Sequence, residues 1–110
     1  MSLVEIAYQL SRKLPGDERF GLVSQMTRAA VSVPANIAEG HASTHRLVYL
    51  RFLSIARGSL AELETYIALA ERLHFLGCDD TGPIRAQSKV VGRLLNALIR
   101  ALRTPAKQSD

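Results

Sequence analysis

Apolar residues recur every three or four positions along most of the chain, with polar residues between them, which is the period of helices buried on one face. The first series lies within residues 2–14 and consists of Leu3, Ile6, Ala7, Leu10 and Leu14. Ser2 and Glu5 have the spacing of a capping box at its start, and Pro15-Gly16 follows its end. The pattern therefore predicts a short first helix.

A second series passes through a proline inside a predicted helix over residues 17–41, with Asp17 as its cap. Its members are Val23, Met26, Ala30, Val33, Ile37 and Gly40. The alternating steps of three and four continue past Pro34 without a change of phase, so we expect this helix to bend there and continue, at a cost of about 3 kcal/mol. Ser32 or a water is the expected partner of the carbonyl that proline leaves free. A packing kink is the favoured interpretation, and a widened turn that admits a ligand is the alternative.

The third predicted helix covers residues 44–77, begins at Ser43 or Thr44 as its cap, and ends at Gly77. Two adjoining apolar stripes follow it at helical spacing. A face this wide must contact several neighbours, because a two-helix seam needs only one stripe. His74 lies on one of these stripes, where a packed, hydrogen-bonded residue is favoured over a catalytic base.

The fourth predicted helix covers residues 80–104, with Pro83 in its first turn, where proline is tolerated. Its start is expected at one of three polar residues, Asp79, Asp80 or Thr81. Its apolar face consists of Val91, Leu94, Leu95, Leu98 and Leu102. Thr104-Pro105 terminates the helix, and residues 105–110 form a tail.

Short connections between consecutive helices favour antiparallel neighbours. The sequence thus predicts an all-α, antiparallel up-down-up-down four-helix bundle as a single domain over residues 1–110. At the rise of an α-helix the third helix would be about 48 Å long and the first about 18 Å. We therefore expect the first helix to cover half of the second, and to leave an apolar groove beside Pro34 of the kind that meets another chain.

Composition is that of a globular domain, with 110 residues, 47% hydrophobic and 22% charged. No secretory leader and no apolar run long enough for a membrane span is present, so we expect a cytoplasmic protein without a membrane partner. The single cysteine, Cys78, excludes an internal disulfide and a multi-thiolate metal site.

The chain has a net charge of +4, and the basic residues of its last third lie at regular intervals. A series at steps of mostly four and seven consists of Arg85, Lys89, Arg93, Arg100, Arg103 and Lys107. No acid lies between Thr81 and Ser109, and the series falls on the side of the fourth helix opposite its leucines. Such a surface suits the phosphates of RNA or DNA, although a solvated helix face is an equally weighted explanation. The aromatic residues lie mostly on apolar stripes, so binding without base specificity is expected.

Other site chemistry is poorly supported. Glu39, His41 and His45 could share a metal ion only on a continuous helix, and the predicted break between Gly40 and Thr44 spoils their spacing. Nucleophilic catalysis needs a positioned base and an acid, and neither accompanies the candidate nucleophiles Ser32, Ser59 and Cys78. We therefore predict no catalytic residues, no metal and no cofactor, and a protein that is not an enzyme.

Gly58, inside the long third helix, predicts the close approach of another backbone, because glycine costs a helix about 1 kcal/mol relative to alanine. Charged residues around it could form ion pairs within or between subunits, namely Arg28, Glu39, Arg51, Arg57 and Glu62. The alternative interpretation is that these residues form isolated surface ion pairs, which contribute little to the free energy of unfolding.

Two stretches, SQMTRAAVSVPANIAEG and YLRFLSIARGSLAELETYIALA, resemble the four-helix-bundle proteins encoded in intervening sequences of bacterial 23S ribosomal RNA genes. The same family includes the accessory variability protein of diversity-generating retroelements. The resemblance extends from Val4 to about Leu102. The chain departs from the family at its front, where its first helix is shorter, and at His41-Ala42, where a Gly-Arg pair is more usual.

The resemblance implies a ring of subunits, commonly a homo-pentamer, without enzymatic activity and with nucleic acid as a possible partner. Candidate contact residues with another subunit or partner are Val31, Val33, Pro34, Ile37, Phe52 and Ile55. The leading hypothesis is a homo-oligomer that binds nucleic acid through the basic face of its fourth helix. The alternative is a structural adaptor that recruits a protein through the groove beside Pro34.

Overall fold

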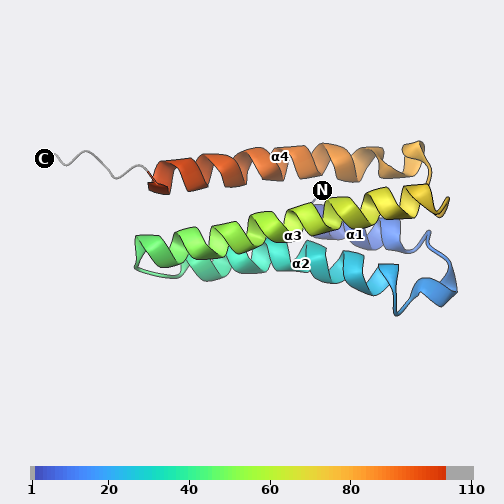
Figure 1. The fold of residues 1–110 in the computed structure, drawn as a ribbon, viewed down its shortest axis with the longest axis horizontal. Coiled ribbons are helices and arrows are strands. Elements are labelled where there is room, and N and C mark those ends of the chain that lie inside the picture. The colour runs from blue at the N-terminus through green and yellow to red at the C-terminus, as the bar shows by residue number, and fades with distance from the viewer. Residues whose placement is uncertain (1, 104–110) are drawn as a thin grey trace, which may run out of the picture.

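The computed structural model describes residues 2–103, which form four α-helices and one 3₁₀ turn (Figure 1). In chain order these are α1 (Leu3–Ser11), η1 (Gly16–Glu18), α2 (Leu22–His41), α3 (Arg46–Arg72) and α4 (Cys78–Arg103). Consecutive helices run in opposite directions in Figure 1. α1 contacts α2 and α4, and α3 also contacts α2 and α4, so the four helices surround one core. The predicted all-α, four-helix fold with a short first helix is confirmed.

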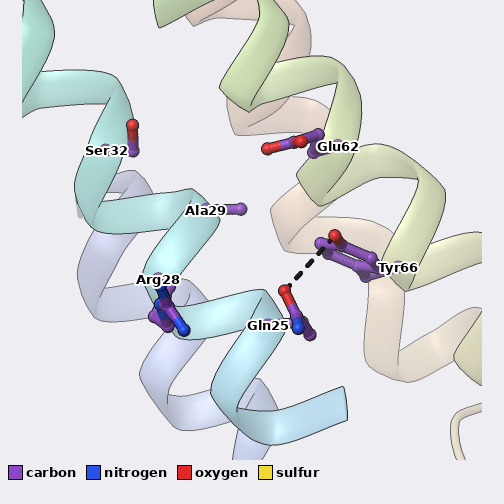
Figure 2. Close-up of a pocket in the computed structure, with 6 residues that line it drawn as sticks. All are labelled: Gln25, Arg28, Ala29, Ser32, Glu62 and Tyr66. Carbon is purple, nitrogen blue, oxygen red and sulfur yellow. Dashed lines mark hydrogen bonds between the residues drawn. The ribbon is translucent and has the colours of Figure 1, made fainter. Parts of the chain in front are cut away.

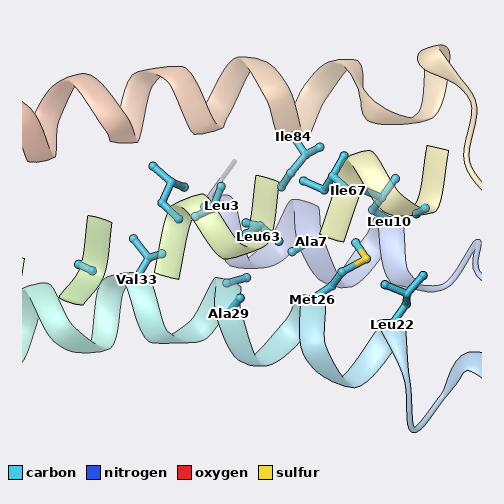
Figure 3. Packing of buried hydrophobic residues seen from close by; sticks show 14 of the residues in the cluster. Leu3, Ala7, Leu10, Leu22, Met26, Ala29, Val33, Leu63, Ile67 and Ile84 are labelled. Atoms are coloured by element: carbon cyan, nitrogen blue, oxygen red, sulfur yellow. The ribbon is translucent and has the colours of Figure 1, made fainter. Parts of the chain in front are cut away.

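The core runs along the inside of the bundle as one cluster of aliphatic side chains (Figure 3). Met26 of α2, Leu63 and Ile67 of α3, and Ile84 of α4 are completely or almost completely buried. The short α1 adds Leu3, Ala7 and Leu10 to this cluster. None of the helices among residues 2–103 has the length and apolar character that a membrane span requires.

α2 continues through Pro34, as the phase of its apolar series predicted. The Ser32 hydroxyl makes no hydrogen bond to the carbonyl that proline leaves free, and is instead hydrogen-bonded with the Ser59 hydroxyl of α3 at 2.8 Å. Asn36 donates to Ser32 twice, to its carbonyl at 2.8 Å and to its hydroxyl at 2.9 Å. The proline turn is thereby joined to α3 by a polar link, and a bend of α2 at Pro34 stays a prediction.

The predicted capping box at the start of α1 is confirmed, with Ser2 and Glu5 bonded to each other's backbone amides. The starts of the later helices differ from prediction. Glu18, not Asp17, accepts the Leu22 amide at 3.2 Å, and α2 begins only at Leu22. No side chain caps α3, which begins at Arg46 after His45.

α4 also begins earlier than predicted, at Cys78. The Asp80 carboxylate accepts the Gly77 amide at 2.8 Å, which is one half of a capping box and fixes the first turn two residues ahead of the expected start. Pro83 consequently lies in the second turn of the helix. The start of α4 is therefore set by the hydrogen bond of Asp80, and not by the preference of proline for the first turn of a helix.

The end of α3 corrects two expectations about Gly77 and His74. α3 ends at Arg72, and His74 takes the left-handed conformation with a φ of 63°. The Phe75 amide donates to the Ala70 carbonyl and the His74 amide to the Glu71 carbonyl, which is the bond pattern of a Schellman motif. His74 is exposed, so the predicted packed position on an apolar stripe is wrong.

Replacement of His74 by glycine is expected to raise the free energy of unfolding by about 1 kcal/mol, because a non-glycine residue is strained in the left-handed region. Urea unfolding followed by far-UV circular dichroism measures the change. A loss of stability would show that the imidazole makes contacts worth more than this strain.

Gly40, rather than Gly58, is the glycine that permits close packing inside the chain. A Cβ atom at Gly40 would lie 2.8 Å from Cδ1 of Tyr49 and 2.9 Å from Cβ of Phe52, so α2 and α3 approach closely there. A Cβ atom at Gly58 would meet nothing within 4 Å. The predicted approach of another backbone to Gly58 is therefore wrong within the chain.

Candidate nucleic-acid interface

The outer face of α4 carries a line of exposed basic side chains. We call Lys89, Arg93, Arg100 and Arg103 the basic ridge, and all four are exposed. From Thr81 to Arg103 the helix contains no acid. At 1.5 Å per residue the ridge is about 21 Å long. The structure thus places these predicted residues together, while Lys107 lies outside the described residues.

Arg85, predicted to belong with this ridge, is held by an acid of α3. Its guanidinium forms an ion pair with the Glu71 carboxylate, which also accepts a hydrogen bond from the hydroxyl of buried Thr81. The Arg85 bond first, and then the Thr81 bond, lower the pKa of Glu71. The charge of Arg85 is therefore largely compensated, which makes it a structural link between α3 and α4 more than a free cation.

α3 contributes two cations beside the ridge. Arg57 donates to the Asn96 side-chain oxygen at 3.2 Å, and Arg46 donates to the Leu102 carbonyl at 2.6 Å near the end of α4. Both partners are neutral, so both charges remain uncompensated by these bonds. Sequence reasoning placed Arg57 among ion pairs and missed Arg46. The available signal was spacing, because Arg46, Leu53 and Leu60 recur every seven residues and so share one face of α3.

The predicted contact residues divide into exposed and buried groups. Val31 is 41% exposed and Ile55 43%, and Pro34 is also exposed. Ile37 and Phe52 are partly buried. Val33 is only 2% exposed, so its assignment as a contact residue is wrong. It follows Met26 and Ala30 at steps of four and three and therefore faces the core.

α4 also exposes apolar side chains that the sequence did not indicate as contact residues. Val90 and Leu94, one turn apart on α4, are 55% and 52% exposed, although Leu94 belongs to the predicted apolar face of this helix. Val31 lines a hollow of about 380 Å³ together with Tyr8 and Thr27. Exposed apolar side chains thus lie on both α2 and α4.

The predicted ion-pair residues do not pair with one another inside the chain. Among residues 2–103, salt bridges join Lys13 to Asp80 and Arg85 to Glu71. In the hollow of about 350 Å³ between α2 and α3, Arg28 and Glu62 both contribute to the lining without pairing, and Tyr66 donates to Gln25 at 3.4 Å (Figure 2). Every member of the set Arg28, Glu39, Arg51, Arg57 and Glu62 is exposed. Pairing between subunits stays a prediction.

The histidines between α2 and α3 have local roles. His41 ends α2 and meets the Tyr49 ring edge-on at a centroid distance of 5.9 Å, and His45 is the residue before α3. Within the described part of the chain, no group of three or more His, Cys, Asp or Glu side chains is arranged to hold a metal ion.

Comparison with known proteins assigns the chain to a protein family. The model of the 23S rRNA-intervening sequence protein family matches residues 1–97. The chain belongs to this family. A solved structure of a protein of unknown function from Bacteroides thetaiotaomicron, described as a member of the S23 ribosomal protein family, is similar to it with a TM-score of 0.79. The two are 25% identical, and the match covers 89% of this chain and 91% of the other. No curated protein matches the chain.

Proposed function

We propose that this family member is a non-enzymatic protein that binds nucleic acid through the basic ridge, with little regard to base sequence. The observation that carries the proposal is the charge pattern of α4, whose exposed outer face bears four cations and no acid between Thr81 and Arg103. Each cation that neutralises a phosphate releases condensed counterions, so a row of cations gains affinity from any backbone that follows it.

The side chains along the ridge favour backbone contacts over base recognition. α4 contains no aromatic residue, so no ring projects from it to stack on bases. Asn96 is engaged by Arg57, and Arg85 by Glu71. The charged groups that remain are flexible lysine and arginine side chains, which contact the phosphates of any sequence.

Binding of fluorescent DNA and RNA duplexes of unrelated sequence tests this function. We expect similar affinities for different sequences of one duplex type, and a linear fall of log affinity with log salt concentration. Fluorescence anisotropy at several salt concentrations measures both. Affinity that is insensitive to salt, or confined to one base sequence, would contradict the proposal.

We also propose that the protein forms a homo-oligomer, of which a pentameric ring is the form that the family resemblance favours. The exposed apolar residues on α2 and α4 support self-association, since such surface usually meets another chain. Two unlike surfaces on each subunit suit the head-to-tail contact that closes a ring. Repetition of the ridge around an assembly would raise avidity for a long nucleic acid.

Native mass spectrometry tests this assembly. The expected result is a species at a whole multiple of the 12.1 kDa chain, with five as the expected multiple. Replacement of Val31 on α2 and Leu94 on α4 by glutamate is expected to shift the population toward the monomer, because burial of unpaired carboxylates in a contact is costly. A monomer alone at micromolar concentration would overturn the oligomer proposal.

A further inference from the structure

A groove between α3 and α4 lies beside the basic ridge. It consists of two adjoining hollows of about 470 and 440 Å³ that share Glu64, Ser88 and Lys89 in their linings. Leu60 and Ala61 of α3 and Gly92 of α4 also line the larger hollow. We call these two hollows together the α3–α4 groove.

The larger hollow has cations from both helices. Arg57 comes from α3, and Lys89 and Arg93 come from α4. The one carboxylate in this lining, Glu64, accepts a hydrogen bond from Ser88, which is 2% exposed. Three cations and one carboxylate leave the lining with a net charge of +2. An anion in the groove would thus meet positive charge from two directions, whereas an anion on the outer ridge meets it from one.

Gly92 keeps the groove open in the middle of a helix. A Cβ atom there would meet only Cδ2 of Leu60, at the ordinary contact distance of 3.6 Å, so packing within the chain does not require glycine. Glycine nevertheless costs a helix interior about 1 kcal/mol relative to alanine. Absence of a side chain at this point leaves room for a group from outside the chain, next to the cations that would attract it.

We propose that the α3–α4 groove holds a segment of nucleic-acid backbone, with its phosphates contacted by Arg57 on one side and by Lys89 and Arg93 on the other. The inference rests on the nucleic-acid binding proposed above and assigns its centre to this groove. Phosphate is the ligand chemistry that fits, because guanidinium and ammonium groups both donate hydrogen bonds to phosphate oxygens.

Two matched charge variants test the groove. Glu64→Gln removes the negative charge from its lining, and Glu62→Gln makes the same change two residues along α3, in the lining of the α2–α3 hollow. We expect Glu64→Gln to tighten duplex binding roughly 3- to 5-fold, as removal of one repulsive charge near a phosphate predicts. We expect Glu62→Gln to change the dissociation constant by less than about 2-fold, because its charge lies farther from the groove.

Two matched steric variants complete the test. Gly92→Gln places a neutral side chain in the groove and is expected to weaken binding at least about 5-fold, while Gly58→Gln, at a site with nothing within 4 Å, is expected to leave it unchanged. Circular dichroism and urea unfolding confirm that each variant is folded. Equal effects of the two glutamate variants, or wild-type affinity of a folded Gly92→Gln protein, would overturn the groove as the binding site.

These experiments distinguish a wrong assignment of the binding site to the groove from a wrong proposal of nucleic-acid binding. If charge reversal on the ridge removes binding while the groove variants are silent, nucleic-acid binding stands and the groove assignment is wrong. If the wild-type protein binds neither DNA nor RNA duplexes, both proposals fall. Binding of inorganic polyphosphate but of neither duplex would keep phosphate as the ligand chemistry and overturn nucleic acid as its source.

Discussion

Gly40→Ala should lower the free energy of unfolding by about 2 kcal/mol, even though alanine is the better helix former. The added Cβ would lie 2.8 Å from Cδ1 of Tyr49, 2.9 Å from Cβ of Phe52 and 3.3 Å from the Tyr49 carbonyl oxygen. Two of these atoms are a backbone oxygen and a Cβ, which cannot rotate away, so α2 and α3 must separate. Overpacking of this kind costs about 1–3 kcal/mol, and helix propensity returns about 1 kcal/mol or less in a strained site.

Gly58→Ala is the matched control for Gly40→Ala. It makes the same chemical change in the long α3, where the new Cβ meets nothing within 4 Å. The expected result is a gain of about 1 kcal/mol from helix propensity alone. Urea unfolding of both variants at one protein concentration gives the comparison. Opposite signs support the close α2–α3 contact, and an equal gain in both variants would contradict it.

Reversal of two ridge charges, Arg93→Glu with Arg100→Glu, should weaken duplex binding by at least about 30-fold at low salt. Each reversal removes a phosphate contact and adds a charge that repels the backbone. A hydrogen bond to a charged group contributes about 1.5 kcal/mol or more, so the loss of two contacts accounts for the expected change. Both residues are exposed, and neither forms a salt bridge among residues 2–103, so we expect the fold to survive.

The control for this variant reverses Arg12 and Arg72 in the same way. Both are exposed, both lie at the carboxyl end of a helix, and neither belongs to α4. The two double variants therefore have the same net charge, and the control loses at least as much favourable interaction with helix dipoles, because Arg100 but not Arg93 lies in the last turn of α4. A fall in affinity of less than about 3-fold is expected for the control. Equal losses in the two proteins would mean that net charge, and not the ridge, determines binding.

The fold was largely predictable because its signals are local and periodic. The apolar series fixed four helices, and its unchanged phase across Pro34 predicted the continuity of α2. Helix ends were less predictable, because several polar residues compete for each cap. Glu18 displaced Asp17, Asp80 set the start of α4, and His74 ended α3 in a conformation that glycine at position 77 was expected to supply.

The candidate site was less predictable because it depends on which helix covers which face. Val31 and Val33 were both candidate contact residues, although only Val33 belongs to the periodic apolar series of α2, and the structure buries Val33 while Val31 stays exposed. The ridge followed from spacing on one helix. The pairing of Arg85 with Glu71, and the positions of Arg46 and Arg57 beside the ridge, depend on the contact between α3 and α4, which the spacing within one helix does not reveal.

The salt dependence of duplex binding tests the central claim, that ridge cations contact phosphates, most directly. The slope of log affinity against log salt should be shallower in Arg93→Gln with Arg100→Gln than in the wild-type protein, by about 0.9 for each phosphate contact removed from B-form DNA. Neutral replacements avoid the added repulsion of a glutamate. An unchanged slope in a folded variant would contradict the account, because those two arginines would then make no contact with the backbone.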